Sequence, residues 1–227
     1  MSKAPIVRGK TPPSQAEATR AALVIAALDL FGRQGFDGTS TREIAASAKA
    51  NIGSIAYHFG SKDGLRIAAA DHIVQTVQAV ADQALNQSPD VSLGPEVARA
   101  QLRNMLEKMV GFIVASPEAG EIVQFILREM AQPSPALDRI YDGVFEPMHR
   151  RLCMMWESAT GEPAESERAR LTVFTLVGQV VYFRIGREAV LRRMGWQAMG
   201  TAESAKVASV AADNLEAILA ARMRNAP

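Results

Sequence analysis

The sequence of 227 residues has few of the features that mark a specialised class of protein. Its single cysteine, Cys153, cannot form a disulfide within the chain, and no group of cysteine and histidine residues has the spacing of a metal site. A disulfide scaffold and a zinc module are therefore excluded, and we expect a reducing, cytoplasmic compartment. We predict neither a bound metal nor a cofactor.

Long apolar runs and an excess of charge of one sign are also absent. The longest uncharged apolar run, Leu171 to Phe183, has 13 residues, fewer than the roughly 18 that a membrane-spanning helix needs. The N-terminus lacks the apolar core of a signal peptide. We therefore expect neither secretion nor insertion into a membrane. Lys and Arg number 25 against 24 for Asp and Glu, so the bulk charge of +1 points to no particular partner.

Charge is nevertheless uneven along the chain. Residues 1–67 hold nine basic and five acidic residues, a net charge of +4, whereas the remainder holds sixteen and nineteen, a net charge of −3. We predict a flexible basic tail at 1–13, because three prolines accompany its basic residues. A small basic domain at 14–67 and a larger domain at 68–227 would follow.

The spacing of apolar residues predicts an all-α protein, because they recur every three or four positions and nowhere alternate over the length of a strand. A first helix at about 15–34 would bury Val24, Leu28 and Phe31, and Gly35 is placed to end it.

Two short helices follow. Ser40 and Glu43 have the spacing of a capping box at the start of one helix, and Asn51 is placed to cap another that runs to Phe59. Ser61 would cap a fourth, longer helix. The remaining helices are predicted at about 96–115, 117–131, 135–160, 164–185, 187–194 and 202–223. The third of these contains Pro147, which lacks an N–H donor, so that helix should kink or split there.

Two short helices joined by a tight turn have the form of a helix-turn-helix unit, whose second helix enters the major groove of DNA. The small side chains of Ala45, Ala46 and Ala48 would let the two helices cross closely. Ile44 and Ile55 would fill the space beneath the crossing. On spacing alone, an ordinary pair of short helices in an α-bundle is an equal alternative.

The residues themselves favour the first interpretation. The runs LDLFGRQGFDGTSTREIAASA (28–48) and NIGSIAYHFGSKDGL (51–65) strongly resemble the N-terminal domain of TetR/AcrR-family transcriptional regulators. The sequence departs from that pattern at Lys49, where the family usually has Gly, and at Ala50, where it usually has Val. In the second half, the stretches QFILREM, FEPMHRRL and VGQVVYFRIGREAVLRRMGW resemble the CecR-like branch of the family.

This resemblance implies a homodimeric, one-component regulator, which we expect to be a repressor. Its C-terminal domain would bind a small-molecule effector and thereby release a near-palindromic DNA operator, with the fourth helix carrying the change between the domains. Physically, Arg42 is best suited to read guanine, and Lys62 to hold a phosphate. The DNA-binding residues expected from position are Ser40, Thr41, Arg42, Asn51, Ile52, Gly53, Ser54, Ala56, Tyr57, His58 and Lys62.

The segment from Leu171 to Phe183 is apolar round most of a helix, which indicates burial on more than one side. We expect it to form a two-fold, four-helix dimer interface with the last helix, and a core pair within a monomer is the alternative. Candidate effector-binding residues are bulky or charged residues of the central helices, each with a structural alternative as core or ion pair: Phe112, Phe125, Arg128, Glu129, Met148, His149, Trp156, Phe174, Tyr182 and Arg184.

Nothing in the sequence points to an enzyme. His58, His72 and His149 are scattered along the chain, and no Cys–His pair has catalytic spacing. Cys153 lies between Leu152 and a methionine, which favours a buried, inert thiol. Two other classes remain as alternatives: a helical enzyme, and a ligand carrier or adaptor that does not bind DNA.

Overall fold

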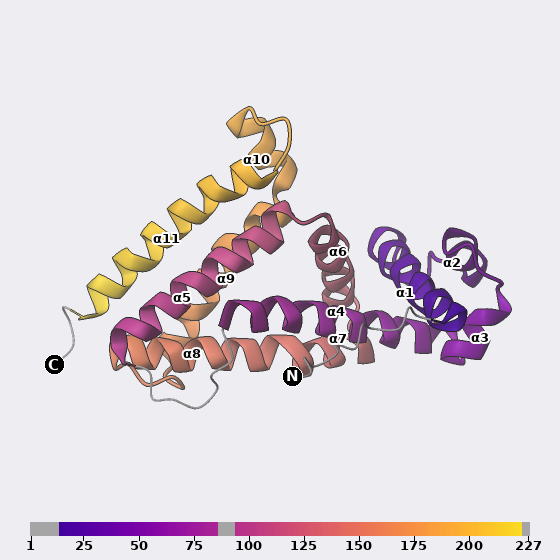
Figure 1. The fold of residues 1–227 in the computed structure, drawn as a ribbon, viewed down its shortest axis with the longest axis horizontal. Helices are drawn as coiled ribbons and strands as arrows, with labels where there is room; N and C mark the ends of the chain where they lie inside the picture. Colours follow the sequence, from indigo (N-terminus) through magenta and orange to yellow (C-terminus); the bar gives the residue numbers. More distant parts are fainter. Residues whose placement is uncertain (1–13, 86–93, 224–227) are drawn as a thin grey trace, which may run out of the picture.

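The structure, a computed structural model, describes residues 14–85 and 94–223, and these form helices without any strand (Figure 1). The all-α prediction is therefore confirmed. The predicted basic tail at 1–13 lies outside the described residues. The helices are α1 (Gln15–Gln34), α2 (Thr41–Ser47), α3 (Gly53–Phe59), α4 (Lys62–Leu85), α5 (Pro95–Val110), α6 (Pro117–Ala131), α7 (Pro135–Ile140), α8 (Glu146–Thr160), α9 (Glu167–Ile185), α10 (Arg187–Met194) and α11 (Thr201–Met223), with π-helical turns η1 (Gly111–Ala115) and η2 (Tyr141–Phe145).

The first helix matches its predicted span. Ser14 caps α1 by accepting a hydrogen bond from the Glu17 N–H, and the Glu17 carboxylate accepts the Ser14 N–H in return. Leu28 and Phe31 lie in the core, as expected. The helix ends at Gln34, just before Gly35 as predicted, and Gly35 has a positive φ of 80° but a ψ of 168°, outside the left-handed helical region.

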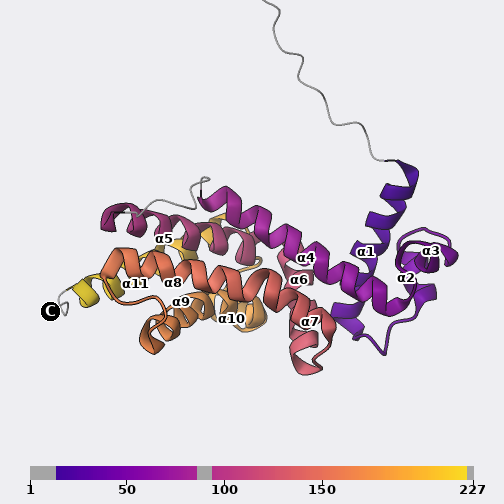
Figure 2. The same cartoon turned by 90° about the horizontal axis from the view of Figure 1, so that it is seen from below.

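Helix α4 leads from the three N-terminal helices into the larger C-terminal domain and crosses residue 67 without a break (Figures 1 and 2). The predicted boundary at residue 67 thus stays a prediction. One hydrophobic cluster is shared by both parts of the chain. In it, Ile122 and Phe125 of α6 and Ile140 of α7 pack with Phe31 of α1 and Ile73 of α4, and all five side chains are almost fully buried.

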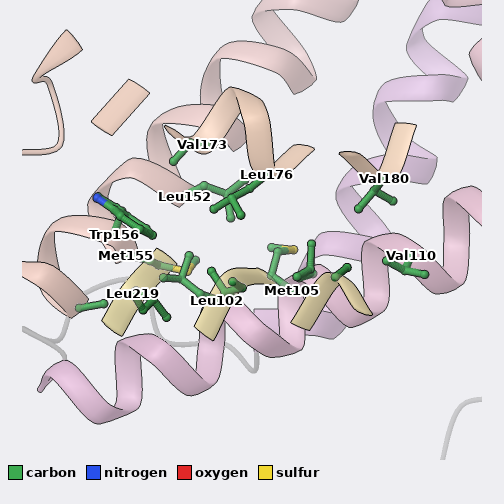
Figure 3. Packing of buried hydrophobic residues seen from close by; sticks show 14 of the residues in the cluster. Leu102, Met105, Val110, Leu152, Met155, Trp156, Val173, Leu176, Val180 and Leu219 are labelled. Carbon is green, nitrogen blue, oxygen red and sulfur yellow. The ribbon is translucent and has the colours of Figure 1, made fainter. Parts of the chain in front are cut away.

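A second cluster forms the core of the C-terminal domain (Figure 3). Trp156 of α8 is fully buried there, and it lies among Leu102 of α5, Val173 of α9 and Leu219 of α11. The Trp156 indole N–H donates to the Glu162 carboxylate over 2.9 Å, so the one polar group of this side chain is satisfied. Helices α5, α8, α9 and α11 therefore form one packed unit.

The predicted interruption at Pro147 takes the form of the π-helical turn η2, which ends just before α8 begins. Because Pro147 has no N–H, the carbonyl of Gly143 lacks its usual helical partner. The Gln78 side chain of α4 donates to this carbonyl over 3.0 Å instead. A Cβ at Gly143 would lie 2.7 Å from the Val74 side chain, so glycine is also needed there for the close approach of α4.

Among the described residues, no single helix has the length and apolar character needed to cross a bilayer. The bent pair Pro95–Ala115 and Pro117–Ala131, with an angle of 88° between its members, meets that criterion only when the two are taken together.

Candidate nucleic-acid interface

The N-terminus of α2 is fixed by a complete capping box. The Ser40 hydroxyl accepts the Glu43 N–H over 3.2 Å, and the Glu43 carboxylate accepts both the N–H and the hydroxyl of Ser40 over 2.8 and 2.7 Å. These two donors hold the pKa of Glu43 below its ordinary value. The box leaves the side chain of Arg42 exposed and that of Thr41 partly exposed. Ser40 itself is engaged within the protein.

The two short helices pack on a few buried apolar side chains. Ile44 and Ile55 are buried beneath their crossing, as predicted, together with Ala45. Ala46 was predicted at the crossing but is exposed, because it lies on the opposite side of α2. Helix α3 begins at Gly53, and its N-cap is Ile52 rather than the predicted Asn51. The Asn51 side chain still accepts the Gly53 N–H over 2.8 Å.

The outer surface of α3 consists of polar, small and isolated apolar side chains. Tyr57 is 82% exposed and Ile52 is 49% exposed. At the C-terminal end of the helix, the Arg20 guanidinium of α1 lies 5.3 Å from the centre of the Phe59 ring and helps to hold α3 in place. Of the predicted contact residues, those exposed are Ser40, Arg42, Asn51, Ile52, Gly53, Ala56 and Tyr57, and those partly exposed are Thr41, Ser54, His58 and Lys62.

Lys62 has a structural partner in addition to its predicted one. Its ammonium donates to the Phe36 carbonyl over 2.5 Å and lies 4.2 Å from the centre of the Phe36 ring. An ammonium has three N–H donors, so two further donors are available to a phosphate. Lys62 therefore ties the start of α4 to the loop between α1 and α2.

The turn between α2 and α3 holds Lys49, a departure from the family pattern, in a backbone conformation that favours glycine. This residue has a φ of 52°, the only positive φ of a non-glycine residue among those described. A side chain in the left-handed region costs roughly 1–2 kcal/mol relative to glycine. The geometry that glycine would adopt without strain is thus reached here at some cost in stability.

The candidate effector-binding residues fall into three places rather than one group. Phe112 and Phe125 belong to the cluster shared with α1 and α4, and Met148 and Trp156 to the core of the C-terminal domain. The aromatic rings at the surface of α9, Phe174 and Tyr182, are more than half exposed. The charged candidates Arg128, Glu129, His149 and Arg184 each contact other parts of the protein.

Glu129 is the most buried of these charged residues, with 2% of its side chain exposed. It forms a two-pronged ion pair with Arg66 of α4, with N–O distances of 2.7 and 2.9 Å, and accepts the Ser134 hydroxyl over 2.5 Å. A carboxylate can be buried at such a site because both of its oxygen atoms accept hydrogen bonds from partners. Arg66 and Arg128 line a cavity of about 250 Å³ at the junction of the domains.

His149 lies between α8 and α9. Its ring stacks on Phe174 with 4.0 Å between centroids, and its Nε2–H donates to the Arg170 carbonyl over 3.1 Å. This tautomer leaves Nδ1 as an acceptor, 3.7 Å from the sulfur of Cys153. Burial raises the pKa of the Cys153 thiol, so it is protonated and unreactive near neutral pH.

Helix α9 is buried on one face and apolar on the other. Its outward side chains Leu171, Phe174, Tyr182 and Ile185 are 55–60% exposed, and their spacing places them along one stripe. We call these four residues the α9 stripe. Beside it lies a groove of about 500 Å³, lined by Glu167, Arg168, Leu171, Thr172, Thr175 and Arg222 of α9 and α11. The predicted second side of burial is therefore not supplied by the described part of the chain.

Comparison with known proteins decides the family. A family model described as bacterial regulatory proteins of the tetR family matches residues 23–69. A second, described as the C-terminal domain of the HTH-type transcriptional dual regulator CecR, matches residues 98–222, more than half of the chain. The chain belongs to the TetR family, in its CecR branch. It is a helix-turn-helix transcriptional regulator and not an enzyme, and regulators of the TetR family bind operator DNA and dimerise.

Relatives in the TetR family cover different shares of the chain. The dual regulator CecR of Shigella flexneri is 33% identical over 190 residues, or 80% of this chain and 82% of that protein. The transcriptional repressor Rv3405c of Mycobacterium tuberculosis is 41% identical over 73 residues, or 32% of this chain and 39% of that protein. The solved structure of SCO4454, a TetR-family regulator from Streptomyces coelicolor, shares the fold with a TM-score of 0.65 at 16% identity, covering 91% of this chain and 97% of that one.

Proposed function

We propose that the protein is a homodimeric repressor that places two copies of α3 in successive major grooves of a near-palindromic operator and leaves the DNA when its C-terminal domain binds a small molecule. The observation that carries this proposal is the surface of α3. Ile55 is the only buried residue of this helix, and its polar and small side chains are exposed or partly exposed.

The proposed DNA contacts divide by chemistry. Arg42 is exposed at the start of α2 and reads guanine through its two parallel N–H donors. Ile52 and Ala56 offer apolar contacts to thymine methyl groups. Thr41, Tyr57, His58 and Lys62 hold phosphates. Ser40 orders the N-terminus of α2 through its capping box, and the Asn51 side chain accepts the Gly53 N–H at the start of α3.

The proposed dimer interface consists of α9 and α11. The α9 stripe supports it, because four large apolar side chains on one face lose contact with water when a second copy covers them. Val210 of α11 is 61% exposed and adds to the same apolar character. A two-fold axis pairs each helix with its own copy or with its neighbour, which gives a four-helix interface.

The effector is proposed to bind in the C-terminal domain, where it changes the separation of the two α3 helices through α4. Because the chromosome is the target, the cytoplasm is the proposed compartment. A second candidate is a dual regulator, which also activates some promoters, since CecR of Shigella flexneri, 33% identical over 80% of this chain, carries that name.

The test is selection of duplexes from random DNA by the purified full chain, followed by gel shift with the selected duplex and with the region upstream of its own gene. The proposal expects a sequence with two-fold symmetry. A ligand carrier, an adaptor or an enzyme would enrich no sequence at low salt, and that result would overturn the proposal. A reporter gene placed behind the selected sequence separates repression from activation.

A further inference from the structure

Helix α6 is anchored at its N-terminal end to the proposed dimer helix. Ile113 lies in the last turn of η1, which ends at Ala115 just before α6, so its carbonyl has no helical N–H partner. The Arg184 side chain of α9 donates to this carbonyl over 2.7 Å and to the carbonyl of Ser116 over 2.5 Å. The guanidinium also lies 3.2 Å from where a Cβ on Gly120 would stand. The first turn of α6 is therefore expected to move together with α9.

At its other end α6 is anchored to α1. Arg128 donates through Nε to the Gly32 carbonyl over 3.3 Å and through Nη2 to the Arg33 carbonyl over 3.1 Å. Both carbonyls lie in the last turn of α1, where no helical N–H reaches them. A cation at this end of a helix is also favoured by the helix dipole. Arg128 thus caps α1 from the opposite domain.

The next residue of α6 makes a second connection. Glu129 forms its two-pronged ion pair with Arg66, and the Arg66 guanidinium lies 4.5 Å from the centre of the Phe36 ring in the loop that follows α1. A charge pair of this kind with little exposure holds its partners in one relative geometry, because any displacement leaves a buried charge unpaired.

The backbones of α1 and α6 also touch directly between these polar contacts. A Cβ added to Gly32 would lie 3.2 Å from both the Gln124 Cβ and the Phe125 backbone nitrogen. Phe125 packs against Phe31, with 6.4 Å between ring centroids. Two helices in such close contact move together unless the polar contacts at the end of α6 are broken.

We propose that Arg128 and the Arg66–Glu129 pair are positioning residues, which set the angle of the DNA-binding helices on the C-terminal domain and so the separation of the two α3 helices in the dimer. Helix α6 carries the position of α9 to α1, along a route additional to α4. The inference rests on the proposed function, since a separation matters only in a dimer that binds both half-sites.

The test compares operators of altered spacing. The selected operator, versions with one or two base pairs inserted or removed at the centre, and a duplex with a single half-site are titrated with the wild-type chain, Arg128→Ala and Arg33→Ala. Arg33→Ala is the matched control, because it removes an equal charge from the end of α1 while leaving the backbone carbonyl that Arg128 contacts. Its own partner is Asp29 of the same helix.

The expected result is a loss of spacing selectivity. Arg128→Ala should bind the selected operator about tenfold more weakly, because it no longer holds both α3 helices at the matching distance. It should bind the altered spacings as well as the selected one, and the single half-site as the wild type does. Arg33→Ala should keep the wild-type spacing preference. Equal weakening on the half-site and the full operator would overturn the inference, and so would a spacing preference that Arg128→Ala leaves unchanged.

A crosslink provides a second measurement in the same background. Cysteines replacing Gly32 and Gln124 would have Cβ atoms 3.2 Å apart before adjustment, close to the roughly 3.8 Å of a disulfide. In the Arg128→Ala chain, oxidation should restore the spacing preference and reduction should remove it again. An oxidised, crosslinked chain that still accepts all spacings would overturn the inference. A wild-type chain that binds no duplex would instead overturn the proposed function itself.

Discussion

Helices α3 and α9 both present large side chains to water, but they do so in different patterns. At α3, the exposed Ile52, which directly precedes the helix, and Tyr57 are separated by small residues and by the buried Ile55. On α9, four large apolar side chains form one stripe. A DNA surface is hydrated both free and bound, so isolated apolar groups suffice. An apolar stripe contributes favourable free energy only when another surface covers it and removes it from water. The two helices are therefore suited to different partners, DNA for α3 and a second copy for α9.

The largest effect is expected from a charge placed in the α9 stripe. Phe174→Arg should give a monomer, because an uncompensated charge would be buried at the centre of the proposed interface. Operator affinity should fall by about 10²–10⁴-fold, since the two half-sites no longer bind as one unit. Sedimentation velocity and gel shift measure the two effects. Met154→Arg is the matched control, because Met154 is 56% exposed but lies outside the stripe, on α8. A dimeric Phe174→Arg chain would contradict the assignment of the interface.

A smaller effect is expected from the polar surface of α2 and α4. Arg42→Ala should weaken operator binding by about 10–100-fold and relax the preference at one base pair, because a two-pronged contact to guanine is lost. Lys62→Ala should weaken binding to all sequences alike and lower the slope of log affinity against log salt by about 1. Titrations on the selected and on a scrambled duplex distinguish the two. If both variants lost affinity equally on both duplexes, the assigned roles would be wrong.

Backbone strain at the turn between the two short helices can be tested by its effect on the free energy of unfolding. Lys49→Gly should raise the free energy of unfolding by about 1 kcal/mol, because glycine adopts a positive φ without steric strain. Gly60→Ala, at a φ of 76°, should change it in the opposite direction. Urea unfolding measures both. Equal or lower stability of Lys49→Gly would show that the side chain of Lys49 contributes more than its backbone costs.

The smallest effect concerns acid stability. The pKa of Glu43 is lowered in the folded protein, so its carboxylate stabilises the fold above the ordinary value of 4.5, and this contribution is lost as the pH falls through the lower, folded value. Glu43→Gln should remove that part of the pH dependence of the urea midpoint while leaving the neutral form capable of a hydrogen bond. If the urea midpoint of Glu43→Gln fell with decreasing pH as steeply as that of the wild type, the carboxylate of Glu43 would not contribute to acid stability.

Local signals in the sequence predicted much of the fold. The Ser40–Glu43 spacing predicted the start of α2, and the predicted end of the next helix at Phe59 matches the end of α3, because such helix boundaries depend on neighbours in the chain. The form of the break at Pro147 could not be predicted, since it depends on Gln78 of another helix. The exposure of Ala46 likewise depends on which side of α2 is packed against the core.

Part of the candidate site was also missed. Arg66 was not singled out, although an arginine among Leu65, Ile67 and three alanines is a signal of a buried partner. Its partner, Glu129, is 63 positions away, and no local pattern connects them. The candidate effector residues were chosen by size and charge. The structure distributes them among two cores and a surface, because residue type does not specify which helix faces which.

In the proposed function, two copies of α3 bind DNA together because contacts between the α9 helices hold the two chains in a dimer. Sedimentation equilibrium of the selected duplex with the full chain, at several salt concentrations, tests it most directly. We expect a complex of one duplex with two chains of 24.4 kDa, whose affinity falls steeply with rising salt. A tight complex of one duplex with a single chain, or an affinity that does not change with salt, would contradict this proposal.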